Sequence, residues 1–220
     1  MFADNAVALE GFRHALLTEG RFNPTAFRNR QNYFAKRNIT AVVTELPLEL
    51  VGAGKVRAWA TVSLVGHAPE VQLSRFGLSL LTHLFLSHVK VREDDNRSSP
   101  VDYLARFSGY IGGLAERLTT LAGSSANPAD YAKRLVARLC PMTLSYELDT
   151  AAAFDFVGLN GRALTDDAMD VILTLATNTA PGDGVAPDRS RTRGVFPYFG
   201  APYTITEQAA VVPHGTPTKK

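Results

Sequence analysis

The sequence has almost no cysteine and little net charge, and both scarcities narrow the possible classes of function. Its 220 residues include one cysteine, Cys140, so no intramolecular disulfide can form. Cys140 follows a helix-like pattern and has no general base close by in the sequence. We therefore expect a buried thiol that packs like a small apolar side chain. A formal net charge of +2 is too small to predict a nucleic-acid or membrane partner.

Long apolar runs are also absent. The longest, residues 78–89, is interrupted by histidine and hydroxyl side chains and is shorter than the ~20 residues that a membrane-spanning helix needs. The first residues, MFADNAVALEGF, carry Asp4 and Glu10 where the apolar part of a signal peptide would lie. We expect neither a spanning helix nor a targeting segment in these two stretches.

Motifs of the common enzyme classes do not occur. The chain has no GxSxG, HExxH, CxxC, P-loop or GxGxxG pattern. His83 and His88 are five residues apart, so they would point to different sides of a helix or strand and would not form a metal-binding pair. These absences favour a non-catalytic protein.

Several segments have the pattern of amphipathic helices. Apolar residues recur at helical spacing over residues 4–17, and Asn23-Pro24 opens a short helix toward Phe34. Ser99-Pro100 and Asn127-Pro128 each place a capping residue before a proline, which predicts helices over residues 99–121 and 127–139. A last helix is predicted to begin at residues 165–167.

The remaining patterns predict strands. Residues 38–51 and 55–65 would form a hairpin around Gly52-Ala53-Gly54, residues 70–76 would add a third strand, and residues 142–148 a fourth. Trp59 lies on the polar side of its strand, which predicts a cover on that side. Residues 78–91 are ambiguous between helix and strand.

These patterns define the expected class and domain organisation. We predict an α+β fold in which an antiparallel sheet, a meander plus at least one further strand, packs against four to five helices. Residues 1–203 would form a single domain, and residues 204–220 a loosely ordered C-terminal tail.

The order of several short motifs resembles a known family. RNITAVVTELPLELVGAGKVRAWATVSL, VQLSRFG, GLNGRALTDDAMDVILTLA, PGDGV and FPYFGAPY follow one another between about Phe22 and Tyr203. This order is similar to the C-terminal portion of the bacterial domain of unknown function family 4331. The resemblance implies an exported, periplasmic or extracellular protein of unknown activity.

The chain departs from that family in two respects. Longer members begin with a signal peptide and a portion containing His-Arg-Glu-Ala-Pro, which this sequence does not have. After VQLSRFG the family continues with Asn-Pro and a second Asn, whereas Leu78, Ser79 and Thr82 stand here. If those asparagines serve a site in the family, this chain has lost it.

The aspartates near the end of the chain are candidates for a calcium site. Asp183 and Asp188 flank a glycine-rich turn and could supply oxygen ligands, although Asp-Gly is also common turn chemistry. Asp166 and Asp167 suit the start of a helix, where the dipole favours carboxylates. Helix capping does not explain Asp170.

The following stretch contains candidate partner-binding residues. Three arginines would share one side of an extended strand, where they could bind an anion or acidic partner or only protect a sheet edge. Four aromatic residues could dock a partner or fold back over the core. These residues are Arg189, Arg191, Arg193, Phe196, Tyr198, Phe199 and Tyr203.

Two hypotheses for function result. The first is a non-catalytic binding or structural protein, such as an accessory subunit of a larger extracytoplasmic assembly, with a protein partner and without nucleic acid. The second is a calcium-dependent binder, or an enzyme of an unrecognised class, that uses Asp170, Asp183 and Asp188.

Overall fold

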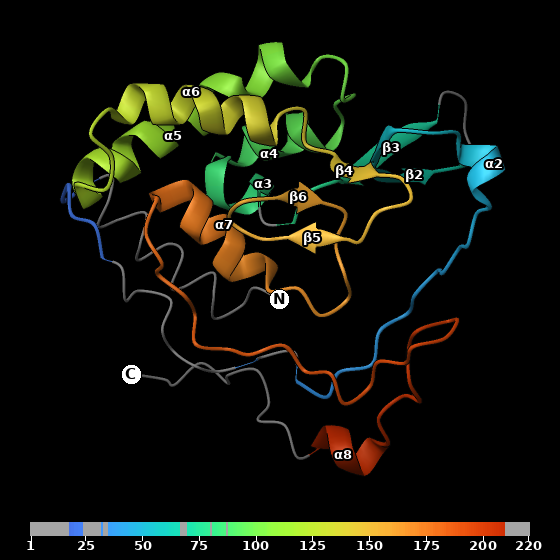
Figure 1. The fold of residues 1–220 in the computed structure, drawn as a ribbon. Helices are drawn as coiled ribbons and strands as arrows, with labels where there is room; N and C mark the ends of the chain where they lie inside the picture. Colours follow the sequence, from blue (N-terminus) through green and yellow to red (C-terminus); the bar gives the residue numbers. More distant parts are fainter. Residues whose placement is uncertain are drawn as a thin grey trace.

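A computed structural model describes residues 18–23, 32, 35–66, 70–79, 81–86 and 88–209. Within these residues the chain forms seven helices and six strands, and the strands pair antiparallel. The predicted α+β class is therefore confirmed (Figure 1). The helix predicted over residues 4–17, and most of the one predicted after Asn23, lie outside the described residues.

Three helices form the main helical layer. α5 (Tyr103–Ala122) lies beside α6 (Pro128–Leu139), and α7 (Ala168–Thr177) packs against α5 from the other side (Figure 1). The buried face of α5 recurs every three or four residues, as an amphipathic helix requires. Its apolar residues are Tyr103, Phe107, Ile111, Ala115 and Leu118.

Of the two helix starts predicted from the sequence, one is confirmed and one lies further along the chain. Asn127 caps α6 by accepting a 3.1 Å hydrogen bond from the Asp130 amide, as predicted. α5 begins at Tyr103 instead of Ser99, because residues 99–102 form a separate turn in which the Val101 amide donates to the Ser99 hydroxyl at 3.3 Å.

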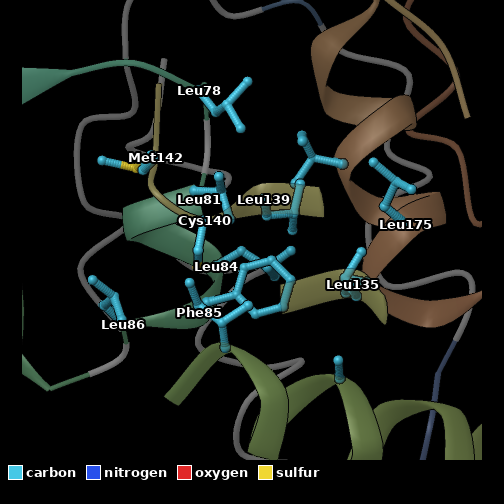
Figure 2. Close-up of a cluster of buried hydrophobic side chains, with 14 of the residues drawn as sticks. Leu78, Leu81, Leu84, Phe85, Leu86, Leu135, Leu139, Cys140, Met142 and Leu175 are labelled. Carbon is cyan, nitrogen blue, oxygen red and sulfur yellow. The ribbon is translucent and has the colours of Figure 1, made fainter. Parts of the chain in front are cut away.

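The ambiguous run after β3 is helical. It forms α3 (Leu81–Phe85) and α4 (Val89–Asn96). The buried side of α3 joins α5, α6 and α7 in one apolar core, and Figure 2 shows Cys140 among these side chains. Cys140 is buried, as predicted.

The strands form three small two-stranded sheets. β1 (Lys55–Ala58) pairs with β4 (Leu144–Glu147), and β2 (Ala60–Leu64) pairs with β3 (Val71–Phe76). The short strands β5 (Ala153–Phe154) and β6 (Leu159–Asn160) form the third sheet. β1 and β2 are two halves of the single strand predicted over residues 55–65, separated at Trp59.

β3 and β4 lie one after the other along the same edge of this long strand. Ala60 pairs with Phe76 and Ala58 pairs with Leu144, so both neighbours reach Trp59 from opposite directions. They meet at Gly77, where an added Cβ would lie 2.1 Å from the Met142 carbonyl oxygen and 2.8 Å from the Thr143 Cα. Backbones this close are side by side and not on opposite edges.

The predicted meander is wrong in one element. Residues 38–47 are extended without a ladder partner, and the next residues form the short helix α2 (Leu48–Val51) instead of a strand. Pro47 cannot donate to a ladder, and the Gly52 amide closes the helical turn by donating to the Leu48 carbonyl at 2.8 Å. Gly52, at φ 103°, then turns the chain into β1.

The segment before α2 runs beside the end of the chain. The Asn38 side chain donates to the Tyr203 carbonyl at 2.9 Å and accepts from the Tyr203 amide at 2.7 Å. Both segments extend below the helical layer toward α8 (Ile205–Ala209) (Figure 1). The first part of the predicted C-terminal tail is thus helical. Among the described residues, no helix combines the length and apolar character needed to cross a membrane.

Candidate functional site

The beginning of α7 brings the aspartates of the sequence together. Asp167 is the N-cap and accepts a 3.1 Å hydrogen bond from the Asp170 amide, as the capping interpretation predicts. Asp166 accepts a 2.6 Å bond from the Ala163 amide. One turn into the helix, Asp170 accepts a 2.8 Å bond from the Asp183 amide, which explains the residue that capping left unexplained.

The glycine-rich turn places the Asp183 carboxylate against the same helix end. Gly182 fits closely here, since an added Cβ would lie 3.0 Å from an Asp170 carboxylate oxygen. The Asp183 side chain itself accepts a 2.8 Å bond from the Val185 amide. The turn chemistry predicted for this stretch is therefore present, and it aims a carboxylate at α7.

Asp167, Asp170 and Asp183 form a three-aspartate cluster. One carboxylate oxygen from each lies within 4.8 Å of the other two, and all three side chains are half-buried. Partial burial, followed by the negative charge of neighbouring aspartates, raises the pKa of both Asp170 and Asp183. Three oxygens at this spacing suit a hard cation such as Ca²⁺, which would complete its shell with backbone oxygens or water.

Asp188 does not join this cluster. Its carboxylate accepts a 2.8 Å bond from the Ser190 amide and a 3.1 Å bond from the Tyr203 hydroxyl. Bonds with Ser190 and Tyr203 hold the pKa of Asp188 below its ordinary value. The pairing of Asp183 with Asp188 expected from the sequence is replaced by Asp183 with Asp167 and Asp170, because the Asp188 side chain turns back on its own loop.

The arginines do not share one strand. Arg189 begins a turn, since its carbonyl accepts from the Thr192 amide at 3.3 Å. Arg191 donates to Glu207 at 2.6 Å and lies 4.3 Å over the Tyr203 ring, so it ties α8 to this segment. Arg193 is exposed and donates its amide to the Tyr198 carbonyl at 2.7 Å.

The aromatic residues form part of a small hairpin. Thr192 and Phe199 form a bridge, and the Tyr198 amide donates to the Val195 carbonyl at 2.8 Å. Phe196 is exposed at the turn, while Tyr198 donates its hydroxyl to the Glu45 carboxylate. Among the predicted partner-binding aromatics, Phe196 is the most exposed to solvent.

A surface that the sequence analysis missed lies on β2–β3. We call the side of this pair that carries Ala60, Val62, Leu64, Val71 and Phe76 the outer face. All five are exposed, with exposed fractions of 54% for Val62 and 61% for both Leu64 and Phe76. The register places Ala60 opposite Phe76 and Leu64 opposite Val71, while Val62 is opposite Ser74 where the register shifts by one residue.

The opposite side of the same strands is polar, and its β3 residues face inward. Ser63 is opposite Gln72, whose side chain donates to the Asn96 carbonyl at 2.7 Å at the end of α4. Thr61 is opposite Arg75, whose exposed fraction is 2%. The hairpin therefore has the reverse of the usual arrangement, in which the apolar side of a sheet faces the core.

Arg75 anchors this inverted hairpin. Its guanidinium donates to the Ser98 hydroxyl at 3.0 Å and to the Met142 carbonyl at 2.6 Å, and it lies 4.8 Å from the centre of the Tyr103 ring. Asp95 is fully buried nearby and accepts from Thr82 at 2.7 Å. Burial raises the pKa of Asp95 and lowers that of Arg75, and each charge partly offsets the effect on the other.

Searches of known protein families, curated proteins and solved structures find no match to this chain. The resemblance to family 4331 stays a prediction. Function therefore has to be inferred from the three-aspartate cluster and the outer face themselves.

Neutralising the cluster is expected to stabilise the metal-free protein. Because the pKa of Asp183 is raised on folding, its ionised form costs stability, which is regained as pH falls through the raised pKa. Asp183→Asn keeps the acceptor for the Val185 amide, so we expect its melting temperature in EDTA at neutral pH to rise by roughly 2–4 °C. The gain should vanish in acid, where Asp183 is already protonated.

Asp188→Asn is the matched control. Its pKa is lowered on folding, so its charge stabilises the folded state, and the same substitution should lower the melting temperature at neutral pH. A fall in melting temperature for Asp183→Asn at neutral pH would contradict the electrostatics of the cluster.

Proposed function

We propose that this chain is a non-catalytic, protein-binding component of a larger assembly, and that it binds through the outer face of β2–β3. The inverted hairpin is the observation that supports this proposal: Gln72 and Arg75 of β3 face the body, while the apolar side chains of the outer face are exposed on both strands. Contiguous exposed apolar surface on a folded protein marks a site of interaction.

The outer face cannot be buried by turning the hairpin over. Rotation would withdraw Arg75 from Ser98 and Met142, and an unpaired buried guanidinium is costly. The apolar side is thus held outward by hydrogen bonds on the inward side. Covering it from outside is favourable, at about 25 cal/mol for each Å² of apolar surface removed from water.

Exposed apolar residues also flank β2 in the sequence. Trp59 and Val65 precede and follow this strand, with exposed fractions of 51% and 88%. Trp59 is not covered in the described structure, contrary to the expectation from the sequence. Tryptophan is enriched at protein interfaces, so an exposed Trp59 directly before β2 supports a protein partner.

The proposal also includes the partner-binding candidates between residues 189 and 203 and an extracytoplasmic location. Phe196 and Arg193 are exposed and could add to a contact, whereas Arg191 is engaged with Glu207. The resemblance to family 4331 supports an extracytoplasmic assembly. The absence of common catalytic motifs from the sequence supports a binding role.

Isosteric substitutions on the outer face test this function. Val62→Thr/Val71→Thr keeps shape and β-branching but places hydroxyls in the apolar surface. We expect it to weaken association with the partner at least tenfold, since burying each valine is worth about 1.5 kcal/mol or more. The measurement is native mass spectrometry of the chain isolated from its own source at several concentrations.

Val101→Thr/Val157→Thr is the control, because both valines are 88% exposed and lie outside the outer face. It should leave the associated mass unchanged. A bare single chain at every concentration, or equal association of both double variants, would show that the outer face binds no protein.

Cation binding at the three-aspartate cluster is a second candidate function. The observation that favours it is the convergence of Asp167, Asp170 and Asp183 within 4.8 Å, in spite of their mutual repulsion. Ca²⁺ would relieve that repulsion and join the glycine-rich turn to α7.

A calcium titration separates this candidate from a purely structural cluster. At about 100 times its Kd, Ca²⁺ should raise the melting temperature by roughly 5–10 °C, from a linkage of about 2.7 kcal/mol. Asp183→Asn should remove this shift and Asp188→Asn should keep it. An equal shift in both variants, or none in the native chain, would rule out the cluster as a calcium site.

A further inference from the structure

We propose that the partner at the outer face is a second copy of this chain, and that the two copies exchange residues 38–46. In this exchange the segment, called the arm below, adds as an antiparallel strand to the free edge of the strand formed by β1 and β2. The proposal rests on the proposed function and names its partner.

One edge of the long strand is unpaired among the described residues. β3 and β4 follow each other along the other edge, as the close approach of Gly77 to Thr143 shows. The Leu148 amide donates to the Gly54 carbonyl at 3.0 Å, so Gly54 points to β4. Backbone groups alternate along a strand, so those of Lys55 and Arg57 point to the free edge, where they can pair with another strand.

The arm is a strand in composition and lacks a ladder partner among the described residues. It reads NITAVVTEL, rich in the β-branched residues that favour strands, and its backbone is extended. Three of its apolar side chains lie largely in solvent: Val42 is 94% exposed, and Ile39 and Leu46 are exposed as well. The arm therefore has both the backbone and the side chains for a contact that the described residues of one copy do not supply.

The hinge after the arm favours exchange over a closed hairpin. Pro47, α2 and Gly52 lie between the arm and β1, and the arm leads away from that strand (Figure 1). The arm is held at both ends, by Asn38 with Tyr203 and by Glu45 with Tyr198. An element that leads away from its own complementary edge can occupy the same edge of a second copy, which is the geometry of domain swapping.

Charge and pattern fit this pairing. The arm has one charged residue, Glu45, and the free edge begins with Lys55 and Arg57. An antiparallel register with Glu45 opposite Arg57 places Val42 opposite Ala60, on the outer face. One arm would thus form hydrogen bonds with the free edge and place Glu45 next to Arg57. It would also extend the apolar surface shared by the two copies.

Cysteine cross-linking tests the exchange directly. Thr44 and Ala58 would form a pair without mutual hydrogen bonds, where Cα atoms are close enough for a disulfide. Thr44→Cys and Ala58→Cys are made in separate chains and mixed under mild oxidation, so a 44–58 bond can form only between copies. Native Cys140 is kept, because burial raises its pKa to about 11 and leaves it unreactive.

We expect the 44–58 heterodimer to form at least about tenfold faster than a heterodimer of Thr44→Cys with Val157→Cys, a site of high exposure away from the edge. As a further test, Thr44→Cys and Ala58→Cys are placed together in one chain. A monomeric internal disulfide in that double variant would show that the arm closes on its own edge, which overturns exchange.

Exchanging the charges of Glu45 and Arg57 tests the same pairing without introduced cysteines. Glu45→Lys and Arg57→Glu should each weaken self-association measured by light scattering, by about tenfold for the two equivalent contacts of a symmetric dimer, and the combined variant should recover most of it. Equal association in all variants would overturn the pairing.

The outcomes separate this proposal from the proposed function. If Val62→Thr/Val71→Thr abolishes an association that shows no 44–58 bond and no charge dependence, the outer face binds a different protein and only the exchange fails. If the native chain forms no complex of any kind, both fail.

Discussion

The buried guanidinium of Arg75 is the interaction on which the rest of this structure depends. It joins β3 to the Ser98 turn, to Met142 before β4 and to the Tyr103 ring of α5. Because a buried arginine must keep its hydrogen bonds, it fixes the polar side of β2–β3 inward. The apolar side must then face outward, so one buried charge creates the surface that we propose as the interface.

Sequence patterns predicted the helical part of the fold well and the strands less well. The buried face of α5 and the Asn127 cap depend on local spacing, which can be read from the chain. Residues 38–51 also read as a strand, but whether a strand finds a partner depends on a distant edge and on the Pro47–Gly52 turn. The inversion of β2–β3 could not be predicted, because alternation shows two sides without showing which one meets the core.

The candidate sites show the same division. Capping by Asp167 and the turn at Asp183 are local and were predicted, whereas their convergence with Asp170 needs the loop after α7 to fold back. Arg75 and Asp95 were missed because an arginine and an aspartate in separate segments give no periodic signal. The sites that sequence analysis missed are formed by residues far apart in the sequence, and local residue preferences carry no information about such contacts.

Trp59 offers the most direct measurement of the central claim, that the outer face is covered in the working protein. It is the one tryptophan of the chain, and it is half-exposed, one residue before Ala60 of that face. Its emission and acrylamide quenching should be followed as the associated species forms. The account predicts a blue shift and reduced quenching on association. An association that leaves the Trp59 emission and quenching unchanged would contradict it.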